Sequence, residues 1–346
     1  MKLGQMTTFE GPEGVVQSGQ ELLSIFLSEP VIQAMEFSPE PSDYKLEPTK
    51  KGSLSKITRK EGEDASRQRL TGSPNLGEQA IYSYEFAMDR FRKLDENVGV
   101  SEDFIKLRAQ RQIAKNTRLL AAAFAAHVIN GAGNASTNEQ MYGLGTLIAD
   151  AAAGSQTARL GFTAAELADM RYPVQLDLTR EDIIDEFLAM LEQEIALVPG
   201  ANAIYLNRFL KSRINTRARK QGVLTSITNL YKQSVEALFG VPLIVVPDAG
   251  IPLTSDTWSG HNNACSLYIV NNSEFDGVDY PTNSGFYYKG FPTTDQDQDN
   301  VSGVHVHTNL RLQSDNCVRR LSQIGLQPYE NVSLVMDLAS LSSSGT

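Results

Sequence analysis

Residues 101–131 read SEDFIKLRAQRQIAKNTRLLAAAFAAHVING, and this stretch predicts one long α-helix. No Pro or Gly interrupts it before Gly131, and it consists largely of Ala, Leu, Arg, Lys and Gln, which lose little rotamer freedom in a helix. Ser101 suits the N-cap position and Asn130-Gly131 the C-cap position. At a rise of about 1.5 Å per residue the helix is about 40 Å long, well above the usual length in a globular domain.

The faces of this predicted helix differ in chemistry. Basic side chains recur at intervals of three or four residues and therefore share one face. This basic stripe consists of Arg108, Arg111, Lys115 and Arg118. Ile113, Leu120 and Phe124 lie roughly opposite, and the Ala-rich run that follows Arg118 lets other backbone approach closely. The sequence leaves open whether the stripe meets packaged nucleic acid, acidic groups of a neighbouring subunit, or only solvent.

Length and composition bound the class of protein. The 346 residues suffice for two domains, and a hydrophobic fraction of 41% supports packed cores. A net charge of -10 argues against tight coating of nucleic acid, because phosphate binding needs Lys and Arg to displace counterions. No apolar run is long enough to cross a bilayer, and the N-terminus lacks a signal peptide, so we expect a cytoplasmic protein without membrane contact. Cys265 and Cys317 fit a reducing compartment, where disulfides are rare.

Upstream of the long helix we expect two segments that do not fold alone. Residues 1–37 are polar and glycine-bearing and predict an extended N-terminal arm. Residues 38–80 combine several prolines with a charged tract and few apolar side chains, which predicts a long two-stranded excursion. Residues 81–86 have the aromatic and β-branched content of its return strand. Because an isolated hairpin is marginal in water, the excursion should lie on another surface.

Downstream, the pattern predicts a second helix and then a strand-helix-strand unit. Thr179 and Asp182 have the spacing of a capping box. The expected buried face of the helix that follows consists of Ile183, Phe187, Leu191 and Ile195. Next come a strand at 203–206, a basic amphipathic helix at 207–221 and a continuously apolar strand at 240–248.

The rest of the chain predicts further strands. Residues 267–271 are apolar, and residues 301–312 alternate as a half-buried strand does. Two later apolar segments, 317–326 and 331–336, have no partner nearby in sequence, and we expect them to return beside the long helix.

Little in the sequence points to catalysis or to a bound cofactor. It lacks a glycine-rich phosphate loop with Lys-Ser/Thr, a full dinucleotide-binding fingerprint and a Gly-x-Ser-x-Gly elbow. His305 and His307 lie two apart on a predicted strand and could share a metal, although two polar side chains on an exposed face is the favoured interpretation. An aspartate run resembles the start of a calcium loop but lacks its Gly and Glu, which favours a solvated loop. This run consists of Asp295, Asp297 and Asp299.

A second group of basic side chains lies on the helix predicted at 207–221. It consists of Arg213, Arg217, Arg219 and Lys220. Solvation of this group is the favoured interpretation, since charge runs on a helix face usually face water.

The order of these parts resembles the major capsid protein of tailed bacteriophages, a fold shared with encapsulins. In that family an arm and an extended loop precede a long spine helix, and helices with a central sheet follow. Gly143-Leu144 resembles the Gly-Leu pair that often comes after the spine helix, and residues 202–207 resemble the strand before a basic helix. Residues 239–248 are similar to the family's strand after a Gly-x-Pro, residues 267–270 to its later sheet strand, and residues 318–336 to its terminal segment.

The resemblance implies an α+β fold with an N-terminal arm, an extended loop, a peripheral domain that carries the spine helix, and an axial domain with a central mixed sheet. The implied divisions are the arm at 1–37, the extended β-hairpin loop at 38–80, the peripheral domain at 81–178 with spine helix 101–131, the axial domain at 179–303, and return strands of the peripheral domain at 304–346. Some members cross-link a loop lysine to an asparagine of a neighbour. Lysines are available at 50, 51, 56 and 60, but neither the acceptor nor the assisting Glu can be matched, so this chemistry is not expected here.

In function, the resemblance implies a structural protein without catalysis, metal or cofactor. Copies of the chain would assemble as hexamers and pentamers into an icosahedral or prolate shell around double-stranded DNA, built in the cytoplasm of a bacterial host. The implied partners are other copies, a scaffolding protein, a portal protein and packaged DNA held by weak non-specific contact, with decoration proteins as a further option. Two alternatives stay open: an encapsulin-like compartment, and a cytoplasmic metal-dependent enzyme that uses His305 and His307.

Overall fold

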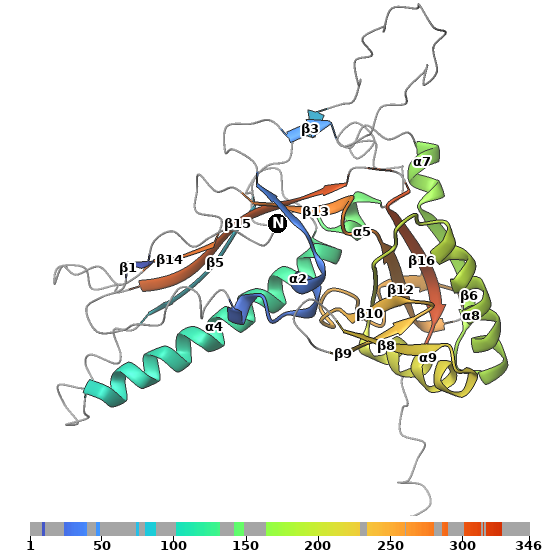
Figure 1. Cartoon of the computed structure of the whole chain (residues 1–346), viewed down its shortest axis with the longest axis horizontal. Helices are drawn as coiled ribbons and strands as arrows, with labels where there is room; N and C mark the ends of the chain where they lie inside the picture. The colour runs from blue at the N-terminus through green and yellow to red at the C-terminus, as the bar shows by residue number, and fades with distance from the viewer. Residues whose placement is uncertain are drawn as a thin grey trace, which may run out of the picture.

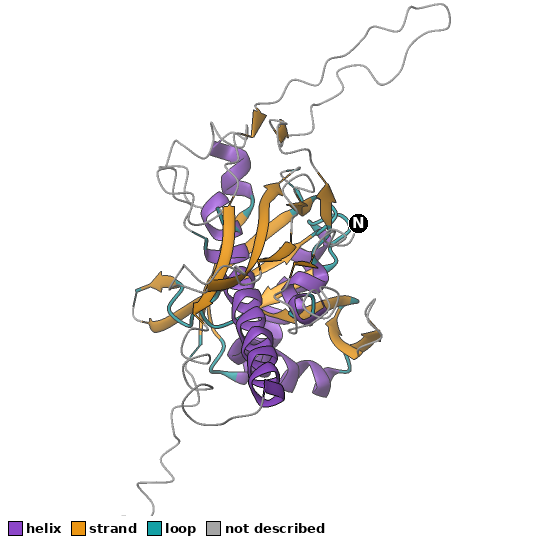
Figure 2. Cartoon of the chain, turned by 90° about the vertical axis from the view of Figure 1, so that its left-hand side faces the viewer, coloured by secondary structure: helices purple, strands orange, loops and turns teal. Residues whose placement is uncertain are grey.

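The structure is a computed structural model of the whole chain. It describes residues 9–10, 24–39, 46–48, 74–75, 80–87, 102–131, 142–148, 164–228, 234–259, 261–279, 286–289, 301–312, 314 and 316–326. Within these ranges the fold is α+β, with helices packed against two mixed β-sheets (Figures 1 and 2).

The larger sheet has eight strands and is the central element of the fold. Along its path lie β6 (Arg171–Asp177), β16 (Val318–Gly325), β12 (His261–Val270), β7 (Ala203–Leu206), β10 (Val241–Val245), β9 (Ser234–Leu238) and β8 (Leu224–Thr228), and β11 (Asp256–Trp258) pairs with β12 off this path. The sheet is mixed, because β6 pairs parallel with β16 and β7 parallel with β10, whereas the other neighbours are antiparallel. The predicted central mixed sheet is therefore confirmed.

The second sheet has six strands built around the long strand β15 (Val301–Leu312). One half of β15 pairs with β14 (Phe286–Lys289) and the other half with β13 (Phe275–Asp279), while β5 (Ala80–Ala87) pairs along residues 301–308. The two outer strands are β1 (Phe9–Glu10) and β2 (Phe37–Pro39). The strands predicted at 81–86 and 301–312 are thus confirmed, and they are partners.

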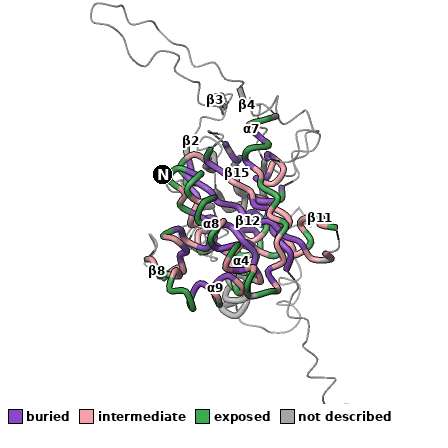
Figure 3. The backbone as a smooth tube through the Cα atoms, turned by 90° about the vertical axis from the view of Figure 1, so that its right-hand side faces the viewer, coloured by how far each residue is buried: buried purple, intermediate pink, exposed green. Residues whose placement is uncertain are grey.

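The helix predicted at 101–131 is confirmed as α4 (Glu102–Asn130). Figure 1 shows α4 running outward from the body below β5, β14 and β15, and it contacts both β5 and β15. Its C-terminal, Ala-rich half is core: Leu120, Phe124 and Val128 are at most 3% exposed. Buried stretches concentrate around β12 and the neighbouring end of α4 (Figure 3).

Two helices cover the eight-stranded sheet on the side away from α4 in Figure 1. They are α8 (Glu181–Ala196) and α9 (Arg208–Gln221), which pack on each other and on strands of this sheet. The helix predicted at 207–221 is confirmed. Asn207 caps it by accepting a hydrogen bond from the Leu210 amide at 2.8 Å, and Gly222 ends it in the left-handed conformation with φ of 73°.

The arm expected over residues 1–37 is wrong for its last part. Residues 24–37 fold onto the body, where α2 (Pro30–Ala34) contacts β10 and α4. Phe26 is fully buried, with its ring 5.7 Å from that of Phe124, and Phe37 is 3% exposed. The burial of several apolar side chains over this short stretch offsets the cost of ordering the backbone. Between β2 and β5 the structure describes one short ladder, β3 (Leu46–Pro48) with β4 (Pro74–Asn75), which is antiparallel as expected for the two arms of an excursion.

Two expectations about the later chain also need correction. Segment 317–326 does not pack beside α4, because β16 lies inside the eight-stranded sheet between β6 and β12. It is held there from the α8 side by Arg319, whose Nε donates to Glu194 Oε2 at 2.5 Å. Segment 331–336 lies outside the described residues.

The capping box predicted at Thr179 and Asp182 does not form. Arg180 is the N-cap residue of α8 without a side-chain cap, Thr179 bonds to Asp177, and Asp182 pairs with Arg180. The expected apolar face of α8 is confirmed in part. Phe187 and Leu191 are fully buried, while Ile183 and Ile195 only pack against the core at its margin.

Contact with the C-terminal end of α4 fixes the position of the Gly143-Leu144 pair. The chain returns at Tyr142, and the short helix α5 (Leu144–Leu147) begins directly against the end of α4. The Gly143 amide and the Thr146 hydroxyl both donate to the Gly131 carbonyl, at 2.8 and 2.7 Å. A Cβ on Gly143 would lie 2.3 Å from the Gly131 nitrogen and 2.5 Å from the His127 oxygen, both backbone atoms, so glycine is required here by space alone.

We therefore expect Gly143→Ala to lower the free energy of unfolding by about 3 kcal/mol or more, since backbone would have to move to relieve the overlap. Gly222→Ala is the matched control, because a Cβ there meets nothing within 4 Å and suffers only from φ of 73°. The control should cost about 1 kcal/mol. Urea unfolding of the soluble chain measures both, and equal losses would contradict the packing at Gly143.

Candidate functional site

The structure describes the side chains of three of the four residues in the basic stripe predicted on the long helix. Arg111, Lys115 and Arg118 are exposed, whereas Asn116 and Thr117 between them are buried. Arg108 lies on α4 too, but its side chain is outside the described set. Among the described residues, none forms an ion pair with the three exposed cations. Leu119, beside Arg118, is a large apolar side chain left 45% exposed. This half of α4 thus presents cations and an exposed leucine.

The second basic group, on α9, was predicted to be solvated, but some of its side chains pair with acidic residues. Arg217 forms two hydrogen bonds to the Asp185 carboxylate, one of them from Nε to Oδ1 at 2.6 Å, and so joins α9 to α8. Arg219 donates to Glu236 at 2.5 Å and so joins α9 to β9. Arg213 and Lys220 also have interactions of their own. Solvation is therefore the wrong interpretation for Arg217, because its side chain is only 27% exposed and its acidic partner is far away in sequence. Arg219 is solvated as predicted, since its side chain is 66% exposed although it pairs with Glu236.

Glu236 is the acidic centre of this contact. It accepts hydrogen bonds from Asn215 at 2.6 Å and Arg219 at 2.5 Å, and Lys211 Nζ lies 3.3 Å from it. Burial raises the pKa of Glu236, but the hydrogen bonds from these three side chains outweigh it and leave the pKa below its ordinary value. The carboxylate therefore stays ionised and holds the β8–β9 hairpin to α9.

We expect Glu236→Gln to destabilise the folded chain by about 1 kcal/mol at neutral pH, because Gln keeps the shape but loses the charge. Because folding lowers the pKa of Glu236, its ionised carboxylate stabilises the fold at pH values above the ordinary pKa of 4.5. This contribution disappears as the pH falls through the pKa of the folded state. The gap between wild type and variant should therefore close in acid. Urea unfolding from neutral pH downward measures it, with the exposed Glu192→Gln as control. A gap that is independent of pH would refute this assignment.

A buried polar network that includes β16 could not be predicted from any local pattern in the sequence. Arg320 pairs with Asp256, and its Nε donates to the Ser266 hydroxyl at 2.9 Å. Ser266 in turn donates to Asp256 at 2.7 Å. These residues come from β16, β11 and β12, and the side chain of Asp256 is only 7% exposed. Their separation along the chain explains why spacing could not reveal them.

The candidate metal ligands gain no support as a group. His305 and His307 lie on β15 opposite Ser83 and Ile81, with side chains outside the described set, as are Asp295, Asp297 and Asp299. In the part of the chain that the structure describes, no group of three or more His, Cys, Asp and Glu side chains could hold a metal ion. Cys265 and Cys317 are both buried and form no disulfide with each other, and burial raises the pKa of the Cys265 thiol to about 12. Such a thiol is not a nucleophile at neutral pH.

The same described ranges contain no helix long and apolar enough to cross a membrane.

Comparison with known proteins gives a match at the level of structure only. No family model and no curated protein sequence matches the chain. The capsid asymmetric unit of cyanophage A-1(L) matches with a TM-score of 0.52 at 11% identity, over 85% of this chain and 92% of that one. The holo-SrpI encapsulin complex from Synechococcus elongatus PCC 7942 matches with a TM-score of 0.47 at 14% identity, over 93% and 95%. A phage-related protein from Bordetella bronchiseptica RB50 matches with a TM-score of 0.46 at 13% identity, over 90% and 99%.

The likeness to the cyanophage capsid subunit spans most of both chains and includes the α+β architecture described above. The chain therefore has the fold of a phage capsid protein, a fold that the element order in the sequence had predicted.

Proposed function

We propose that this protein is the subunit of a self-assembling capsid shell. The observation that carries the proposal is the match over 85% of this chain and 92% of a cyanophage capsid subunit. Fold alone does not fix function, but this architecture builds a closed shell from repeated contacts between copies. In this proposal the chain is structural and has neither catalytic residues nor a cofactor.

We further propose that the shell is that of a tailed bacteriophage and encloses double-stranded DNA. The expected contacts are those of hexamers and pentamers, with a scaffolding protein and a portal protein as assembly partners and decoration proteins as a further option. Assembly takes place in the cytoplasm of the bacterial host. The net charge of -10 supports only weak, non-specific contact with the genome, because like charges repel.

The division of the chain follows the predicted one with three adjustments. We propose the arm at 1–23, the extended loop at 38–80, the peripheral part around α4 and β15, and the axial part around the eight-stranded sheet. Residues 24–37 join the body because their apolar side chains are core, and β6 and β16 join the axial part because they belong to its sheet. The strands β13 and β14 join the peripheral part because they pair with β15. The β3–β4 ladder supports a two-stranded loop that rests on an adjacent copy.

Electron microscopy of the purified chain, expressed with and without its genomic neighbours, tests the shell proposal. We expect closed particles of uniform size, because one repeated set of contacts closes by symmetry. Nuclease-protected DNA inside particles made during phage growth supports the phage version, whereas particles that instead enclose an enzyme identify the encapsulin-like alternative. Small soluble oligomers under every assembly condition would contradict the shell itself.

The basic stripe offers a second test. We propose that Arg111, Lys115 and Arg118 face acidic groups of a neighbouring copy. Changing all three to Glu should leave the chain folded, because these side chains are exposed, but should reduce the yield of particles at least about tenfold, since unlike charges become like charges at every repeat. Arg180→Glu with Arg208→Glu is the control, because both arginines are exposed and already pair with an acid of the same chain. If the variant forms particles at normal yield but packages less DNA, the stripe contacts DNA instead of a neighbouring copy. If the particles form at normal yield and contain the normal amount of DNA, the stripe contacts only solvent.

A further inference from the structure

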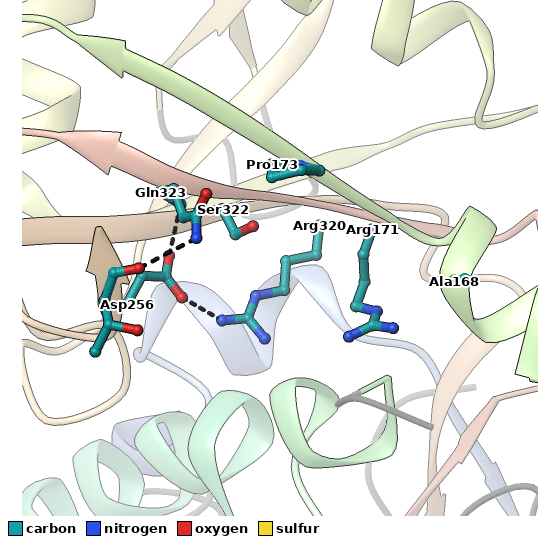
Figure 4. Close-up of a pocket in the computed structure, with 8 residues that line it drawn as sticks. Ala168, Arg171, Pro173, Asp256, Arg320, Ser322 and Gln323 are labelled. Atoms are coloured by element: carbon teal, nitrogen blue, oxygen red, sulfur yellow. Dashed lines mark hydrogen bonds and ion pairs between the residues drawn. The ribbon is translucent and has the colours of Figure 1, made fainter. Parts of the chain in front are cut away.

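Two arginines stand directly opposite each other at one edge of the eight-stranded sheet. Arg171 on β6 and Arg320 on β16 are partners in the parallel register, followed by the pair Pro173 and Ser322 on the same face. Figure 4 shows both arginine side chains extending from the two strands in the same direction, with their guanidinium groups side by side. An anion placed between two guanidinium groups is attracted by both of them.

These guanidinium groups line a groove of about 420 Å³, which also includes Ser322 and Gln323 of β16 and Asp256 and Thr257 of β11. Its lining carries two arginines and one acid. Asp256 already accepts hydrogen bonds through both carboxylate oxygens. Its Oδ1 accepts from Arg320, and its Oδ2 accepts from the Ser266 hydroxyl at 2.7 Å and from the Gln323 backbone amide at 3.0 Å.

The same contacts make Arg320 a rigid donor. Its Nε donates to Ser266 at 2.9 Å, and its guanidinium carbon lies 5.8 Å from the centre of the Tyr268 ring. Arg171 Nε contacts the Leu167 carbonyl at 3.4 Å, which orients its guanidinium group from the α7 side. A planar guanidinium that is already oriented loses little entropy when it binds a carboxylate.

We infer that this groove binds a carboxylate side chain of a second copy of the chain, placed between Arg171 and Arg320. The inference rests on the proposed shell function, in which each copy has neighbours at its edges. Each copy can supply the ligand, since the chain has 41 acidic against 31 basic residues. Tyr172, whose side chain lies on the opposite face of the edge strand β6, is 41% exposed, so this edge of the sheet is accessible to another copy.

A neighbouring carboxylate fits this groove better than a nucleic acid does. Duplex binding depends on several phosphate contacts made by many cations. Among the described residues that line the groove there is no Lys and there are two arginines, and Asp256, which also lines it, repels a polyanion. A single carboxylate needs only one contact, which can be a bidentate hydrogen bond to one arginine or a contact shared by both arginines.

The test compares Arg171→Glu with Arg180→Glu in full-length chains, by counting particles in electron micrographs and by sedimentation. Both variants make the same change of charge, but Arg180 lies in a local pair with Asp182, 66% exposed on both sides. We expect wild type and Arg180→Glu to form particles equally, and Arg171→Glu to form at least about tenfold fewer, because the new acid repels the incoming carboxylate. Arg171→Lys should restore much of the yield, since it keeps the charge. Trp258, the only tryptophan of the chain and part of β11 beside the groove, reports by fluorescence whether each variant is folded.

Particles of Arg171→Glu at wild-type yield would overturn the inference while leaving the shell proposal intact. If Arg171→Glu does not fold, Arg171→Gln replaces it, with the same expected loss and the same contradicting result.

If the wild-type chain forms no particles, the shell proposal fails, and the groove is tested alone with a fluorescein-labelled tetraglutamate peptide and a short DNA duplex. Peptide binding lost in the Arg171 variant supports a carboxylate groove. Binding of the duplex only, or of neither probe, overturns it.

Discussion

The fold depends on the packing of the Ala-rich half of α4 into the body of the protein. Small side chains there let backbone approach closely: Gly250 lies so near Ala126 that a Cβ on it would be 3.0 Å from the Ala126 Cα. Phe124 packs on Phe26 from the N-terminal region, and Asn130 donates to the Ala249 carbonyl. One helix end therefore gathers segments that are far apart along the chain. Because this end is fixed on several sides, the other half of α4 can extend outward as a stiff beam with its cations exposed.

The two sheets differ in how they are held in the fold. The eight-stranded sheet is covered by α8 and α9 and tied by ion pairs that cross between elements, such as Arg217 with Asp185 and Arg319 with Glu194. Removing one partner of such a pair would leave the charge of the other partner without a counter-charge. These contacts therefore fix one arrangement of the helices on the sheet. The six-stranded sheet instead follows the long strand β15 and contacts α4 through β5 and β15. The chain therefore combines a compact half with an extended half, which is compatible with the proposed role of a shell subunit.

Sequence reasoning succeeded where the signal is local. The long helix, the helix at 207–221, and the strands at 203–206 and 301–312 all follow from propensity and period in residues that lie close together in the chain. It failed where a residue's role is set by a distant partner. Residues 24–37 read as a polar arm because their core partners, among them Phe124, lie about a hundred positions away. The place of β16 was missed for the same reason, since its neighbours β6 and β12 are set by tertiary pairing. The acidic partners of Arg217, Arg219 and Arg320 left no spacing pattern at all.

The central claim is that the subunit is complete in its core but incomplete at its extended surfaces, which become ordered by contact with other copies. Hydrogen exchange with mass spectrometry, on the soluble chain and on assembled particles, tests this most directly. The account predicts that amides in residues 120–130 and in β12 are protected equally in both forms, while those in residues 105–118 and in the β3–β4 ladder gain protection only in particles. Equal protection of these outer segments in the two forms would contradict it.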